Sequence, residues 1–249
     1  MYKKLASPDF RVTLNNMQIE SGFFVDYYGS EDEHTNRCIL TPYGDAAEAL
    51  ADADLTDIII EIGCDYDYCT LVQGHGYSMD GTENILVKDD MTRLKDTFIQ
   101  ETFLNCSPDE VLRYIFVQCG ITEYQLPQKK YERKTVFSVP RMTALQVMEE
   151  IKHYWNLEVF YGFIDGIFYW DCEPEQDEIY ELDSSNILDL EQSGKIWTAE
   201  VVPVPWIRIG QLILVTDSAF YGAARIKKCV IKTKTGEKID MYIQFTGVE

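Results

Sequence analysis

Three histidines and seven cysteines are the residues of this chain best suited to bind a metal or act as nucleophiles. His34 follows three consecutive acidic residues, 31–33, and such a carboxylate–imidazole set could hold a divalent ion. No second ligand with metal spacing lies nearby, so the sequence favours a solvated loop tip. His75 lies between two glycines, which a bulge or a tight turn explains. His153 falls beside the apolar stripe of a predicted helix, which indicates a structural role.

The segment 64–69 (CDYDYC) places two thiols and two carboxylates within six residues. Its spacing is not C-x-x-C, and no second Cys/His pair completes four ligands, so a turn between two strands is the favoured interpretation. The seven cysteines are odd in number and scattered. We expect them to be reduced, mostly buried, and made in a bacterial cytoplasm.

Two acidic pairs could also do chemistry. The spacing of Asp52 and Asp54 matches the first two acidic positions of a calcium-binding loop, but the third acidic position and the central glycine are missing. Asp89 and Asp90 could serve in glycoside hydrolysis, yet adjacent residues of a strand point to opposite faces. A helix N-terminus explains these two carboxylates more simply. No nucleophile-elbow, zincin, Walker or dinucleotide motif occurs. The sequence therefore predicts no enzyme: no catalytic, cofactor-binding or metal-binding residue, and no cofactor.

Composition limits the partners. The net charge is −20, which argues against tight binding of nucleic acid because few cations can displace phosphate counterions. An acidic surface suits a conduit through which DNA slides, and it equally suits simple solubility. Hydrophobic residues make up 46% and aromatic residues 13%, enough for a packed core. We also expect no signal peptide and no membrane span.

Residues 1–90 are predicted to be all β. Alternating apolar residues at 10–14 are followed by the turn signal Asn15-Asn16, and further strands are expected at 22–28, 37–40, 57–62, 69–73 and 84–88. The Ile-rich strand 57–62 is predicted to be buried on both faces.

Residues 91–176 are predicted to form a small α+β module. Two capping boxes begin helices, one at Ser107-Pro108-Asp109-Glu110 and one at Thr143-Ala144-Leu145-Gln146; Gly120 and Asn156 end them. A strand is expected at 135–139. Strands at 158–164 and 167–171 flank Asp165-Gly166, a strong hairpin signal.

Residues 184–249 return to β structure, after an acidic connector predicted at 171–183. Strands are expected at 197–202, 211–215, 224–233 and 238–246, and the stretch 204–215 is typical of barrel-type β structure. In the last strand, apolar residues alternate at 239, 241, 243 and 245, and so face one way. The fold class predicted is α+β, mostly β, with two β-barrel-like domains (1–90 and 177–249) and the α+β module 91–176 between them.

Several blocks, taken in order, resemble the late control protein D family, the baseplate hub proteins of contractile-tailed phages and phage-like particles. They are the opening 11–19 with Gly22-Phe23, the helix 111–121 with Tyr124, the strand 134–139, the hairpin 165–170, and Pro205-Trp206-Ile207 with Gly210 and the terminal hairpin. The resemblance lies in the order of the blocks across nearly the whole chain, since each motif alone is a common strand, cap or turn signal.

The resemblance implies a homotrimer in which each subunit carries two similar β domains. Six such domains would form a pseudo-sixfold ring that adapts the sixfold tail tube to a threefold spike. The partners implied are further copies of the chain, the central spike, the tail tube or tube-initiator protein, and the tape-measure and wedge proteins. The location implied is the tail baseplate of a virion or phage-like particle. Two other hypotheses stay open: a β-rich carbohydrate-binding or adhesion module, and a cell-wall hydrolase.

Overall fold

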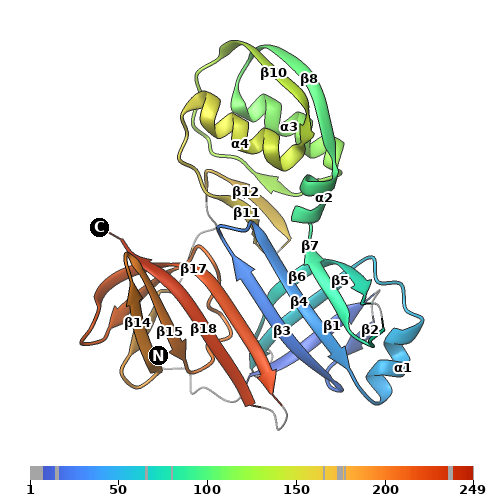
Figure 1. Ribbon diagram of the computed structural model, residues 1–249, viewed down its shortest axis with the longest axis vertical. Helices are drawn as coiled ribbons and strands as arrows, with labels where there is room; N and C mark the ends of the chain where they lie inside the picture. The colour runs from blue at the N-terminus through green and yellow to red at the C-terminus, as the bar shows by residue number, and fades with distance from the viewer. Residues whose placement is uncertain are drawn as a thin grey trace. The chain divides into compact units, whose positions relative to one another are not determined.

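A computed structural model describes residues 8–14, 17–64, 67–79, 81–164, 166–172, 176, 178–234 and 238–248. The chain divides into two compact units (Figure 1). The β unit comprises Met1–Asp89 together with Glu175–Glu249, and the α+β unit comprises Asp90–Pro174. Each unit has a hydrophobic core of its own.

The first part of the β unit contributes seven strands and one short helix. In chain order they are β1 (Asp9–Leu14), β2 (Met17–Ile19), β3 (Phe23–Ser30), β4 (Thr35–Pro42), α1 (Asp45–Ala51), β5 (Ile58–Cys64), β6 (Asp67–Ser78) and β7 (Ile85–Asp89). The strands pair in the order β3-β4-β7-β6-β5-β1-β2, and every neighbouring pair is antiparallel. This order places β2 at one end of the sheet.

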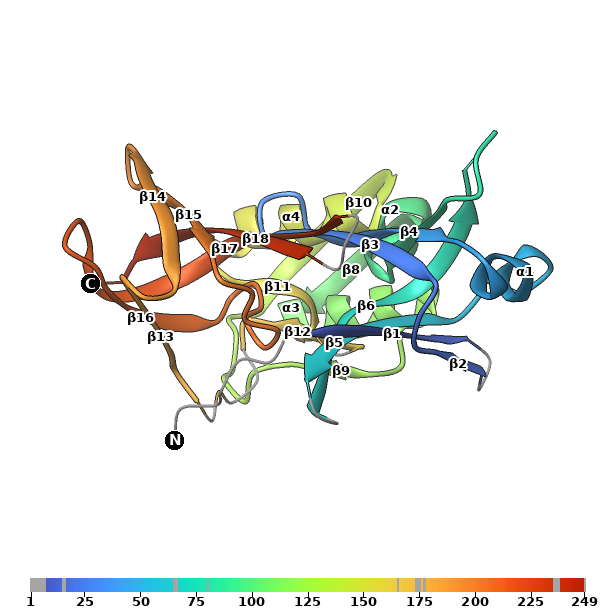
Figure 2. The same cartoon turned by 90° about the horizontal axis from the view of Figure 1, so that it is seen from below.

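The last part of the β unit continues the same sheet. Its strands are β13 (Tyr180–Asp183), β14 (Ile187–Ser193), β15 (Ile196–Val201), β16 (Leu212–Thr216), β17 (Tyr221–Lys234) and β18 (Lys238–Gly247). The long strand β17 pairs with β16 through its first residues and with β3 through its last ones. Within the described residues the two β blocks therefore form one 13-stranded sheet. Helix α1 and the β14–β15 hairpin lie at opposite ends of it (Figure 2).

The core of the β unit follows from the alternation of apolar residues along its strands. In β18 Met241, Ile243 and Phe245 are buried, which confirms the predicted one-sided pattern. The same core takes residues from both β blocks, including Val25 and Ile60. The separation of these blocks into two barrel-like domains stays a prediction.

The described part of the α+β unit contains three helices, a two-stranded ribbon and a small sheet. Its elements are α2 (Met91–Asp96), β8 (Phe98–Cys106), α3 (Pro108–Cys119), β9 (Tyr124–Gln125), β10 (Lys134–Thr143), α4 (Ala144–Trp155), β11 (Tyr161–Ile164) and β12 (Ile167–Trp170). Strands β8 and β10 form the ribbon, and β11, β12 and β9 form the sheet. Both predicted capping boxes are present, and Gly120 and Asn156 end the helices in the left-handed region.

The structure corrects several sequence predictions. Residues 1–90 are not all β, because α1 lies between β4 and β5. Part of the acidic connector is a strand, since β13 within it pairs in parallel with β16. The strand expected from residue 158 begins only at Tyr161. The strand expected at 57–62 was predicted to be buried on both faces, but only one face is fully buried and Ile59 on the other face is partly exposed. Strand β8 was not predicted.

Some turn signals fall on residues outside the described ranges. These are Asn15-Asn16, Asp165 and residues 235–236 of the Lys-rich turn expected at 232–236, whose residues 232–234 belong to β17. Their flanking strands nevertheless pair as expected. Leu14 lies opposite Met17, Ile164 opposite Ile167, and β17 pairs with β18 along most of its length.

Candidate functional site

The histidines lie apart, on different elements. His34 has a left-handed backbone (φ 44°) in the turn after β3. His75 lies on β6 opposite Lys88 of β7, and His153 is an exposed residue of α4. The glycines beside His75 serve strand packing, because a Cβ on Gly74 would lie 2.0 Å from the carbonyl oxygen of Lys88. They leave room for a neighbouring strand, and neither a bulge nor a ligand is needed to explain them.

The segment 64–69 connects two antiparallel strands. Cys64 ends β5 and lies opposite Asp67 at the start of β6, while Asp65 and Tyr66 lie outside the described residues. The seven cysteines, all within the described residues, form no disulfide, and Cys38, Cys64, Cys106, Cys119 and Cys229 are buried. Burial raises the pKa of the Cys229 thiol to about 12, so it stays protonated at neutral pH. In the part of the chain that the structure describes, no group of three His, Cys, Asp or Glu side chains is placed to hold a metal.

The acidic pairs have structural roles. Asp89, at the end of β7, is buried and accepts hydrogen bonds from the backbone and side-chain amides of Asn36 (2.8 and 3.1 Å). Asp90 precedes α2 and forms an ion pair with Arg93 (3.0 Å). Asp54 accepts a hydrogen bond from the amide of Thr56 in the loop after α1. The two carboxylates at 89 and 90 are thus separated, as the strand geometry predicts.

A loop between β15 and β16 inserts into the core of the β unit. Val204, Trp206 and Ile207 are buried there, so this part of 204–215 is a loop and only its end is a strand. Arg208 holds the loop in place. Its Nε donates to the carbonyl of Thr70 on β6 (3.1 Å), and its Nη1 donates to the carbonyls of Pro205 and Ile207 (2.5 and 2.9 Å). This guanidinium thus connects the two β blocks.

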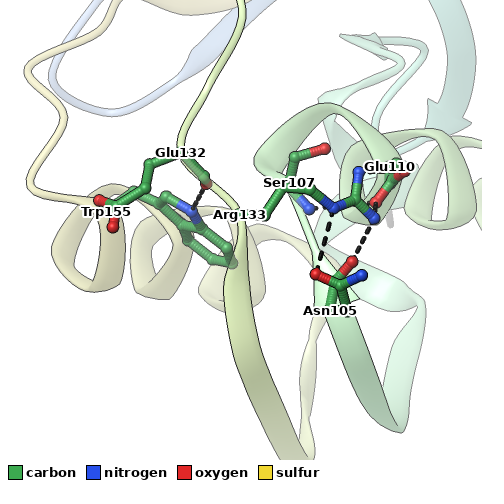
Figure 3. A network of polar contacts seen from close by, with 6 residues as sticks. All are labelled: Asn105, Ser107, Glu110, Glu132, Arg133 and Trp155. Atoms are coloured by element: carbon green, nitrogen blue, oxygen red, sulfur yellow. Dashed lines mark hydrogen bonds and ion pairs between the residues drawn. The ribbon is translucent and has the colours of Figure 1, made fainter.

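In the α+β unit, Arg133 links the start of α3 to strand β8 of the ribbon (Figure 3). Its Nη1 and Nη2 donate to both carboxylate oxygens of Glu110 (2.8 and 2.9 Å), and Nη2 also donates to the carbonyl of Asn105. Glu110 in turn accepts from the amide of Ser107, the residue before α3 (3.1 Å). On the other side, the indole Nε1 of Trp155 donates to the carbonyl of Glu132 (2.7 Å). The segment before β10 is therefore held by both helices.

We predict that the contribution of Glu110 to stability disappears in acid. The hydrogen bonds from Arg133 lower the pKa of this carboxyl, so its stabilisation is complete above the unfolded-state pKa and is lost as the pH falls through the folded-state value. Wild type should melt at a higher temperature than Glu110→Gln at pH 6, and this difference should shrink below about pH 4.5. Glutamine can also form the capping box, so this variant removes only the charge of Glu110.

Glu150→Gln is the matched control, because Glu150 is an exposed residue of α4. Its melting temperature should differ little from wild type at every pH. A difference between wild type and Glu110→Gln that stays constant from pH 6 to pH 3 would contradict the assignment.

Three cations and two tyrosines form a row across the outer face of the β unit. Arg37 lies directly opposite Lys88 on the paired strands β4 and β7. Arg37 and Lys228 both pack on the ring of Tyr28 (4.4 and 4.7 Å to its centroid), and Lys88 lies 5.3 Å from the ring centroid of Tyr77. We call these five residues the cation–tyrosine row. Of these residue types, tyrosine and arginine are enriched at protein interfaces.

Comparison with known proteins gives a class of fold. No protein-family model matches the chain, and no curated protein is similar enough in sequence to match. Solved structures do match, over nearly its full length, and they show that the chain has the fold of phage tail proteins.

Three of these structures define the likeness. The 43 kDa tail protein of prophage MuSo2 from Shewanella oneidensis superposes with a TM-score of 0.73 at 10% identity, covering 97% of this chain and 98% of that one. A tail protein from Neisseria meningitidis MC58 gives 0.71 at 10% identity, with 97% of each chain covered. An E. coli component of the type VI secretion system, described as structurally similar to the T4 tail proteins gp27 and gp5, gives 0.65 at 8% identity over 96% of this chain and 77% of that chain.

Proposed function

We propose that this chain is a structural baseplate hub of a contractile phage tail or of a related injection particle. The observation that carries the proposal is the match of 97% of the chain to 98% of a prophage tail protein with a TM-score of 0.73. The likeness to a secretion component compared with gp27 and gp5 supports the hub position within the tail. The block order that resembles the late control protein D family points the same way.

In this proposal, three copies form a ring that adapts the sixfold tail tube to a threefold spike. Each copy supplies two β domains, one from β1–β7 and one from β13–β18, so six domains surround the axis. Within the described residues, β2, β13 and β14 each pair along one edge only. Unpaired edges of this kind can accept strands from neighbouring proteins.

The exposed apolar side chains support an assembly role. Ile179 and Leu188, beside and within the edge strands β13 and β14, are 61% and 63% exposed, and Tyr221 at the start of β17 is 81% exposed. Such residues are unfavourable on a lone soluble protein when they lie close together. We place contacts with the tail tube and the spike on this end of the sheet. Tape-measure and wedge proteins complete the set of partners, in the baseplate of a virion or phage-like particle.

The test is to purify the full chain alone and together with the spike protein of the same particle, and to determine mass and symmetry. We expect homotrimers by native mass spectrometry and rings with threefold symmetry by electron microscopy, with three hub chains for each spike trimer. Deleting the gene should leave no complete tails. Tails that assemble normally without the chain would overturn the proposal.

A further inference from the structure

The cation–tyrosine row gathers three positive charges on neighbouring strands of a chain rich in acid. Arg37, Lys88 and Lys228 form no ion pair with any carboxylate in the described ranges, although the chain contains 42 acidic residues. The neighbouring cation Lys227, by contrast, binds Glu31 (2.8 Å).

The arrangement of the row costs stability in an isolated subunit. Like charges directly opposite each other in an antiparallel ladder repel, and Arg37 and Lys88 are such a pair. The tyrosine rings offset part of this cost by cation–π contact. Of the acidic residues 31–33 beside the row, Glu33 accepts a hydrogen bond from the Tyr28 hydroxyl and Glu31 is bound to Lys227. An external carboxylate surface would remove the repulsion.

The opposite end of the same strands carries such a surface. Residues 38–60, which include the end of β4, α1 and the loop after it, contain five acidic residues and no lysine or arginine. In β4, Arg37 lies near the start of the strand, and Pro42 ends it directly before α1. In β7, which pairs with β4, Ile85 is the first residue and Lys88 lies near the end. The row and α1 therefore lie at opposite ends of these strands (Figure 1). Around α1 the acidic side chains are exposed: Asp45, Glu48, Asp52, Asp54, Asp57 and Glu83.

This acidic end is also hollow. A cavity of about 380 Å³ lies between α1 and the residues that precede β7. Glu48 and Glu83 line it from two sides, and Pro42 and Leu50 supply apolar walls. A carboxylate-lined hollow with apolar walls suits a long cationic side chain, whose stem is apolar and whose head is charged. We call α1, Glu48, Glu83 and this cavity the acidic hollow.

We infer that the cation–tyrosine row of one copy docks on the acidic hollow of a second copy of this chain. The contact joins two different surfaces at opposite ends of the same strands, so it is head-to-tail, and repeated around an axis it can close into a ring. The inference rests on the proposed function, because it identifies two of the surfaces by which the hub trimer closes. A nucleic acid is the weaker occupant, since a net charge of −20 repels phosphates at long range.

Charge reversal tests the docking from both sides. The two double variants are Arg37→Glu/Lys88→Glu in the row and Glu48→Lys/Glu83→Lys in the hollow. Each should raise the trimer dissociation constant by about tenfold or more, measured by mass photometry. The quadruple variant, which exchanges the two charges, should restore association to near the wild-type constant. Wild-type association should weaken as salt is raised, because exposed charges are screened.

The matched control is Lys130→Glu/Lys195→Glu, which changes the net charge equally at two exposed lysines outside the row and the hollow. It should associate like wild type. Circular dichroism identifies any variant that fails to fold, and the hollow variant then tests the contact without altering the row.

The outcomes separate this inference from the proposed function. A wild-type trimer that both double variants leave unchanged overturns the docking and leaves the hub proposal standing. A wild-type chain that stays monomeric overturns the trimer and the docking together. If Arg37→Glu/Lys88→Glu instead abolishes binding of a fluorescein-labelled DNA duplex and leaves association unchanged, the row binds nucleic acid and the inference is overturned.

Discussion

Gly74→Ala is expected to destabilise the β unit by about 3 kcal/mol or more, which is a large effect for one methyl group. The added Cβ would lie 2.0 Å from the carbonyl oxygen of Lys88 and 3.0 Å from the Cα of Asp89, both of which are backbone atoms of β7. Backbone atoms cannot rotate away as the end of a side chain can. Strand β6 pairs with β5 and β7 at this residue, so relief requires separating strands in the middle of the sheet.

Chemical denaturation followed by circular dichroism measures this loss. Gly162→Ala is the control, because Gly162 also lies in a strand and its Cβ would meet nothing nearer than 3.8 Å. Alanine there should be neutral or slightly stabilising, since it restricts the unfolded chain. Equal stabilities of the two variants would show that β6 and β7 are not held as closely as the structure has them.

The Gly74 contact also bears on assembly. It sets the spacing between β6 and β7, and Lys88, whose carbonyl it approaches, is a member of the cation–tyrosine row. Because Arg37 reaches the row by pairing with β7, a shift of this strand would move two cations together. The close approach of Gly74 to the backbone of β7 therefore helps to position Arg37 and Lys88 of the proposed interface.

Local signals in the sequence predicted local structure well. The capping boxes at Ser107 and Thr143 and the helix ends at Gly120 and Asn156 depend on residues within one turn, and the structure contains all four. The one-sided burial of β18 likewise follows from its own alternation. Helix α1 escaped prediction because it is short and lacks a side-chain cap, since its N-cap residue is Gly44.

Pairing between distant strands could not be predicted in the same way. Strand β17 pairs with β16 and with β3. Its pairing with β3 joins residues about 200 positions apart, and no periodicity within β3 or β17 encodes that pairing. The cation–tyrosine row depends on this register, since Lys228 reaches Tyr28 only through it. The sequence excluded recognisable catalytic motifs, but it could not bring together Arg37, Lys88 and Lys228.

The β15–β16 loop depends on the same long-range arrangement. In the sequence its apolar residues are typical of a strand, and only the structure shows Trp206 and Ile207 inserted into the core. Arg208 holds them in place. Its guanidinium donates to the carbonyl of Thr70 in the first β block and to the carbonyls of Pro205 and Ile207 in the last β block. A planar guanidinium can span such acceptors, whereas an ammonium presents a single charged point.

Arg208→Met should therefore destabilise the β unit by about 3 kcal/mol, because three carbonyl groups lose a charged donor while the apolar stem is retained. Arg208→Lys should recover only part of this loss. Trp206 fluorescence and chemical denaturation measure the effect, and Trp206 should become more exposed in the methionine variant. Arg141→Met, which removes an exposed guanidinium packed on Phe98, should change stability by about 0.5 kcal/mol or less. If Arg208→Met were as stable as that control, the loop would be held by the burial of Trp206 and Ile207 alone, and Arg208 would not be the link between the two β blocks.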